Sequence, residues 1–168
     1  MSNISIFCKS YRGDLAPAAT MVESVRRHNR DNLLLYIAVP QADLELFKAR
    51  IGSDYVHWIA DEEVMAANPD ISLTKFHSLP GHISQQIVKA EFWRVNPHDN
   101  YVCIDSDSRF IRDFQTGDFI ASTGEPYTIL REGKPFMQFC LANGVRETEL
   151  DFEKMSQDMR DYFGRQGP

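Results

Sequence analysis

Short apolar runs rich in β-branched and aromatic residues alternate with longer amphipathic runs along most of this chain, and this alternation limits the possible folds more than any other feature. Strand-like runs cover residues 4–11, 33–39, 55–60 and 101–104, and helix-like runs cover 16–28, 44–51 and 82–95. Such an order is typical of α/β domains, in which helices cover the faces of a sheet. The sequence therefore predicts an α/β fold.

Weaker patterns fill the rest of the chain. We expect a short helix at 62–67, bounded by Asn68-Pro69, and breakers at 79–81 before the next helix. Residues 109–114 and 126–130 are predicted strands, and residues 147–163 are a predicted terminal amphipathic helix.

Length and composition indicate one ordered domain over residues 1–168, because the chain has 168 residues and is 43% hydrophobic. The longest apolar run, 33–39, is far shorter than the roughly 20 residues that span a bilayer, so we expect no transmembrane segment. No signal-peptide pattern opens the chain, which makes the cytoplasm the expected location. Cys8, Cys103 and Cys140 are predicted to be reduced core thiols.

The formal net charge of −6 argues against a nucleic-acid-binding protein. A phosphate ligand would then have to be held locally, by a metal ion or by a few placed cations.

Polar side chains follow three of the predicted strands, at the points where those strands end. The end of the first strand gives Lys9-Ser10-Tyr11-Arg12, the end of the third gives Asp61, and the end of the fourth gives Asp105-Ser106-Asp107. Ligands of open α/β sheets bind outside the carboxyl ends of the strands. Two carboxylates one residue apart at such an end provide the hard oxygen ligands that suit Mg²⁺ or Mn²⁺. We therefore predict a metal site at Asp105 and Asp107.

Other interpretations of Asp105-x-Asp107 were weighed against the same residues. A solvated surface turn is the simplest alternative, because a chain with 24 acidic residues contains such triplets by chance. An EF-hand loop starting at Asp105 fails, since Phe110 and Thr116 stand where Gly and Glu are required. A haloacid-dehalogenase-type phosphatase would place the pair at the first strand, followed two residues later by threonine, where this chain has Arg109.

The predicted helix before the fourth strand carries Gln85, Gln86 and Lys89, and helical spacing puts Lys89 on the same face as both glutamines. Gln86 and Lys89 are therefore candidates for contacts with a diphosphate or with sugar hydroxyls, although a solvated helix face explains them equally well.

The stretches FCKSYRGDL, QQIVKAEFW and YVCIDSDSRFIRDF resemble a bacterial family of predicted glycosyltransferases with the GT-A fold, and the similarity extends over most of the chain. The resemblance implies a Rossmann-like GT-A fold with a mixed, mostly parallel sheet. It also implies a nucleotide-diphosphate sugar donor and a divalent metal at Asp105 and Asp107, with Asp105 and Ser106 among the donor-binding residues. Ser10, Tyr11 and Arg12 would hold the base and ribose, and Asp61 would point at the nucleotide.

Enzymes with this fold are longer and have an acceptor-binding half, which we expect this chain to lack. The expected function is metal-dependent glycosyl transfer to a saccharide or cell-surface glycan precursor, or the donor-binding half of such an enzyme. A non-catalytic nucleotide-sugar-binding module and an α/β phosphotransferase are the alternatives. We identify no catalytic base, and we expect a homodimer because apolar surface left by the missing half favours self-association.

Overall fold

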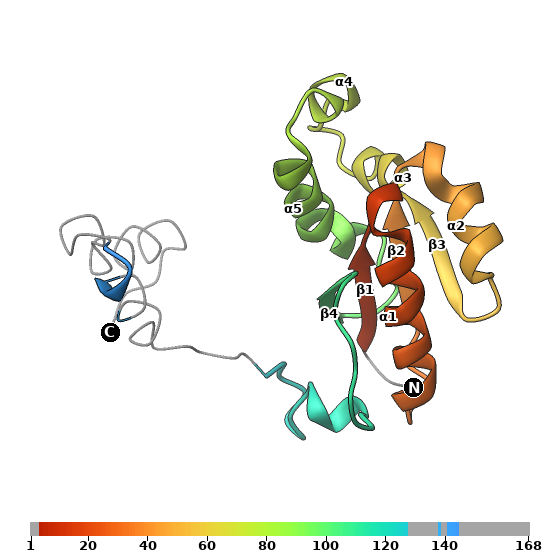
Figure 1. The fold of residues 1–168 in the computed structure, drawn as a ribbon, viewed down its shortest axis with the longest axis vertical. Coiled ribbons are helices and arrows are strands. Elements are labelled where there is room, and N and C mark those ends of the chain that lie inside the picture. Colours follow the sequence, from red (N-terminus) through yellow and green to blue (C-terminus); the bar gives the residue numbers. More distant parts are fainter. Residues whose placement is uncertain (1–3, 128–137, 139–140, 145–168) are drawn as a thin grey trace. The chain divides into compact units, whose positions relative to one another are not determined.

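Four parallel strands form the centre of the fold (Figure 1). In the computed structural model, which describes residues 4–127, 138 and 141–144, the sheet has the order β3-β2-β1-β4. The strands are β1 (Ile4–Lys9), β2 (Leu35–Val39), β3 (Val56–Ala60) and β4 (Asn100–Asp105). Because the chain adds β2 and β3 on one side of β1 and then crosses to place β4 on the other, the sheet has a topological switch point between β1 and β4.

Helices cover both faces of this sheet. The helices are α1 (Leu15–His28), α2 (Leu44–Ile51), α3 (Asp61–Ala66), α4 (Leu73–His77) and α5 (Gly81–Glu91). The short 3-10 turns are η1 (Arg12–Asp14), η2 (Gln41–Asp43), η3 (Phe92–Arg94) and η4 (Thr116–Asp118). One core cluster joins α1 and α2 to one face, and a second joins α3, α4 and α5 to the other (Figure 1). This arrangement is Rossmann-like and confirms the predicted α/β class.

The first half of the fold follows the sequence pattern closely. Met21, Val22 and Val25 recur at helical spacing in α1 and are buried against the sheet. The helix α2 ends at Gly52, whose φ of 90° lies in the region that favours glycine. Strands β1 and β2 are buried almost throughout, as expected for strands covered on both faces.

Residues 109–114 do not form the predicted strand. Only Phe114 makes an isolated bridge, to Asn29, while the Phe110 amide donates to the Ser24 hydroxyl of α1 at 3.1 Å. Phe110 and Phe114 stack on each other with ring centroids 3.9 Å apart and pack on the α1 side of the core. The apolar residues of this segment therefore anchor a loop to a helix, and strand pairing was the wrong interpretation.

The structure agrees only in part with several other predictions. All neighbouring strands within the described ranges are parallel, so the antiparallel part of the predicted mixed sheet is not among them. Pro126 makes an isolated bridge to Ile120, whereas 128–130 and the predicted helix at 147–163 lie outside the described residues. By internal contacts the chain divides into residues 1–127 and 128–168, and the sheet belongs to the first unit. No helix in the described ranges is long and apolar enough to cross a membrane.

The cysteine prediction holds for one residue. Cys8 is a buried free thiol, as predicted. Cys103 is a free thiol too, but it is exposed, because it lies on β4 at the edge of the four-stranded sheet. Cys140 lies outside the described residues.

Candidate functional site

A cavity of about 550 Å³ lies at the carboxyl ends of β1, β2 and β3. The residues after these strands form its floor, and α4, α5 and the loop that joins them form its wall. Its polar lining includes Lys9, Ser10, Tyr11, Asp61, Glu62 and His77, together with His82 and Gln85 from α5. The cavity therefore occupies the edge of the sheet at which α/β proteins bind ligands.

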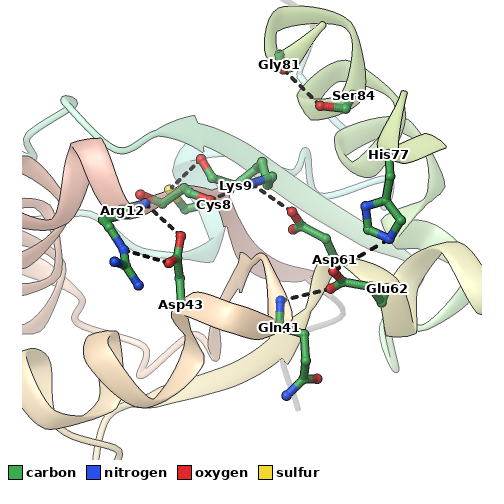
Figure 2. Close-up of polar contacts among 11 residues, drawn as sticks. Cys8, Lys9, Arg12, Gln41, Asp43, Asp61, Glu62, His77, Gly81 and Ser84 are labelled. Carbon is green, nitrogen blue, oxygen red and sulfur yellow. Dashed lines mark hydrogen bonds and ion pairs between the residues drawn. The ribbon is translucent and has the colours of Figure 1, made fainter. Parts of the chain in front are cut away.

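A buried ion pair forms part of the cavity floor. Lys9 Nζ lies 2.9 Å from Asp61 Oδ2, and both side chains are less than a tenth exposed, at 7% and 6% (Figure 2). Lys9 Nζ also donates to the backbone carbonyl of Ser10. Burial raises the pKa of Asp61 to about 6, although the Lys9 ammonium opposes this shift. Near neutral pH the pair thus holds two opposite charges in a poorly solvated place.

Two buried polar atoms of this floor have no hydrogen-bond partner among the residues that the structure describes. They are Ser10 Oγ and Asp61 Oδ1, and both residues line the cavity. Ser10 is 1% exposed and Asp61 is 4% exposed, so bulk water does not solvate them freely. An unsatisfied buried polar atom costs about 1–3 kcal/mol. A ligand that offers a donor to Asp61 and a polar group to Ser10 would remove this cost.

The rim of the cavity is organised by further polar contacts. Arg12 donates to Asp43 twice, from its backbone amide at 3.0 Å and from Nε at 2.9 Å (Figure 2). Glu62 accepts from the amide of Gln41 at 2.9 Å, and His77 Nε2 lies 4.0 Å from the same carboxylate group. The loops after β1 and β2 are thereby joined to each other, and α4 is brought toward α3.

The end of β4 carries a separate set of contacts. Lys89 Nζ donates to Asp105 Oδ1 at 2.5 Å, and the side chain of Asp105 is 67% exposed. Ser106 is buried, and its hydroxyl donates to Asp14 Oδ2 at 2.9 Å. Asp107 is exposed. The Ser106–Asp14 bond joins the loops that follow β1 and β4, at the topological switch point of the sheet.

The end of β4 carries two acidic side chains. In the described part of the chain, no three His, Cys, Asp or Glu side chains form a group that could hold a metal by themselves. Magnesium is commonly bound through one or two carboxylates while phosphate oxygens and waters supply the other positions. Asp105 and Asp107 are exposed carboxylates one residue apart, and they are the pair that would take part in such a site.

A family model described as a family of unknown function, DUF6492, matches residues 3–140, which is most of the chain. The chain belongs to this family. No curated protein matches it. The matched range includes every candidate site residue of this DUF6492 member, but the family description assigns no activity to them.

The structure brings only some of the predicted residues of the DUF6492 chain together. Ser10, Tyr11 and Asp61 line the cavity. Arg12 is held by Asp43 outside the lining, and Gln86 is exposed on α5 while its neighbour Gln85 lines the cavity. Lys89, Asp105, Ser106 and Asp107 gather at the end of β4 instead.

Sequence reasoning assigns no role to three contributors to this site. Lys9 is recognised as a polar residue at the end of the first strand, but a lysine that ends a strand of buried residues is also a signal of a buried partner. Asp43 follows β2, so the same strand-end rule that found Asp61 could have found it. His77 belongs to α4, a helix of five residues that has no helical periodicity to detect.

Proposed function

We propose that this protein binds a nucleotide-diphosphate sugar at the carboxyl edge of its sheet and is a metal-dependent glycosyltransferase of GT-A type, or its donor-binding half. The observation that carries the proposal is a pair of buried atoms, Ser10 Oγ and Asp61 Oδ1, which have no partner among the described residues and lie in one cavity at the carboxyl edge of the sheet. At the same edge, β4 ends in Asp105, and Asp107 follows in the turn. The donor class comes from the sequence resemblance, and the polar cavity supports it.

The floor of the cavity suits a group that offers a hydrogen-bond donor and an acceptor side by side. Asp61 Oδ1 accepts, the Ser10 hydroxyl donates or accepts, and Lys9 Nζ has three N–H groups of which two have the partners described above. Both the edge of a nucleobase and the diol of a ribose have this character. We therefore assign the nucleoside to the cavity and the diphosphate to the β4 end.

The proposed reaction is displacement at the anomeric carbon of the sugar, with the nucleoside diphosphate as leaving group. A divalent cation held by Asp105 and Asp107 would stabilise the negative charge that develops on that leaving group. Lys89 supplies a further positive charge at the same strand end. Ser106, bonded to Asp14, keeps the turn between the two aspartates in place.

A non-catalytic donor-binding module is the second candidate. The same cavity would serve such a module, because its polar floor could hold the nucleoside of a donor without any transfer of the sugar. Release of nucleoside diphosphate from a donor panel, with and without a saccharide acceptor, distinguishes the two. A homodimer and a cytoplasmic location complete the proposal, and light scattering tests the first of these.

A thermal-shift panel of uridine, guanosine, adenosine and cytidine diphosphates with Mn²⁺ tests the binding step. A ligand at about 100 Kd stabilises the native state by about 2.7 kcal/mol, which corresponds to roughly 5–10 °C in Tm for a chain of this size. Ser10→Ala should lose most of this shift, while the Tm of the free protein should rise, because the substitution removes a buried hydroxyl that has no partner among the described residues. Ser53→Ala, at an exposed site before β3, is the matched control. A flat panel for the unmodified protein would exclude the proposed ligand class.

A further inference from the structure

The Lys89 ammonium forms an ion pair with Asp105, one of the two aspartates proposed to bind the metal. Its Nζ donates to Asp105 Oδ1, and its side chain is 16% exposed, compared with 67% for Asp105. The Tyr101 hydroxyl donates to the Lys89 carbonyl at 2.7 Å and so fixes this turn of α5 against β4. The lysine is therefore held in place from the protein side, while the aspartate faces outward.

Other cations near the carboxyl edge are engaged elsewhere. Arg12 is bound through Nε and its backbone amide to Asp43, and Lys9 is buried against Asp61. Lys89 is the cation that the structure pairs with the Asp105-x-Asp107 turn. An ammonium and a divalent cation bind the same carboxylate oxygens and repel each other at short range.

We propose that Lys89 is a built-in competitor of the metal ion and that it couples metal binding to diphosphate binding, an inference that rests on the proposed function. In the nucleotide-free protein the ammonium occupies Asp105 and weakens metal binding. A diphosphate offers Lys89 a second anionic partner, which frees Asp105 for the metal. By linkage, the metal and the diphosphate then strengthen each other's binding by the same factor.

The test is a calorimetric titration of the full chain with Mn²⁺, alone and in the presence of inorganic pyrophosphate or the nucleoside diphosphate with the largest thermal shift. Lys89→Met should lower the Kd for Mn²⁺ alone about 2- to 5-fold, the range expected when a partly exposed ion pair no longer competes. The gain in Mn²⁺ affinity caused by the diphosphate should shrink in this variant, and the affinity for the diphosphate should fall.

Lys48→Met is the matched control, because Lys48 is also a helical lysine paired with a carboxylate, Glu45, at 3.1 Å. It removes the same charge from the protein and should titrate like the unmodified chain. Lys89→Arg keeps the charge and should retain weak Mn²⁺ binding. Lys89→Gln provides a second neutral variant if circular dichroism shows that Lys89→Met is unfolded.

Two results would overturn the inference. One is a Lys89→Met or Lys89→Gln protein that binds Mn²⁺ no more tightly than the unmodified chain, and the other is an equal gain in Lys48→Met. In either case, metal-dependent nucleotide binding by the unmodified protein would leave the proposed function standing. Conversely, tighter Mn²⁺ binding in Lys89→Met without any nucleotide binding would support the competition and refute the proposed function.

Discussion

Replacing the buried Lys9–Asp61 pair with apolar residues should separate stability from binding. The pair lies in the cavity floor with a 2.9 Å ion-pair distance and side chains that are 7% and 6% exposed. Exchange of a buried ion pair for apolar residues of similar size is often neutral or stabilising by about 1–4 kcal/mol. We therefore expect Lys9→Met/Asp61→Leu to be at least as stable as the unmodified protein near pH 7, yet unable to bind the nucleotide.

The magnitude follows from the pKa of Asp61. Burial raises it from the ordinary value of 3.8 to about 6, a difference of about two units or about 3 kcal/mol. Between these values the native state holds a proton that the unfolded state releases, so the contribution of Asp61 to the free energy of unfolding decreases as pH rises. This contribution is fully present below about pH 4 and is lost above about pH 6. The double variant lacks it at every pH.

The assay is urea denaturation of both proteins at several pH values between about 4 and 7. The stability of the double variant relative to the unmodified protein should increase by about 3 kcal/mol over this range. The single variant Asp61→Leu leaves the buried Lys9 ammonium without a counter-charge, so its free energy of unfolding should fall by about 3–5 kcal/mol. As a control, Lys48→Met/Glu45→Leu removes an exposed pair and should change stability by less than about 1 kcal/mol. A pH-independent difference, or a double variant as unstable as Asp61→Leu, would refute the reasoning.

Two further predictions concern the end of β4. Asp105→Asn and Asp107→Asn should each change the free energy of unfolding by less than about 1 kcal/mol, because both side chains are exposed, and each should lower the metal-dependent affinity for the nucleotide. If both variants unfold and their folded fraction binds the nucleotide with unchanged affinity, the pair is structural. In a Cys140→Ser background, a thiol reagent should modify the exposed Cys103 in the native protein and should modify Cys8 only after denaturation, because burial raises the pKa of Cys8 to about 12. Peptide mapping that shows modification of Cys8 in the native protein would contradict the packing of β1.

The sequence predicts the elements of the β1–α5 segment well wherever many residues contribute to one pattern. Helix α1 starts one residue from its predicted position and ends at the predicted residue, because its buried face repeats over fourteen residues. The segment 109–114 shows the limit of the method. Its apolar residues were assigned to a strand by type alone, whereas Phe110 and Phe114 pack on the α1 side of the core. Short segments take their structure from tertiary contacts, which no local pattern contains.

The candidate site was predictable where it depends on single strand ends. The sequence identifies Ser10 and Asp61 because each lies at the end of a predicted strand, and parallel strands end at one edge of a sheet. Their grouping with Lys9, and the Ser106–Asp14 bond, depend on which strands are neighbours. That order, with β4 beside β1, is a property of the whole sheet. Gln85 lines the cavity and Gln86 does not, because of the rotation of α5 about its axis, which helical spacing alone does not determine.

The position of the unsatisfied atoms argues for a ligand more strongly than their number. Ser10 Oγ and Asp61 Oδ1 together destabilise the free protein by about 2–6 kcal/mol, a large share of the roughly 5–15 kcal/mol that separates folded from unfolded domains. A ligand at about 100 Kd contributes about 2.7 kcal/mol in return, which is of the same order. Both atoms lie in one cavity at the carboxyl edge, whereas His98 Nδ1, a third such atom among the described residues, is not part of its lining. A defect of packing has no reason to collect there, whereas a binding site that is completed by its ligand must leave its polar atoms open at that place.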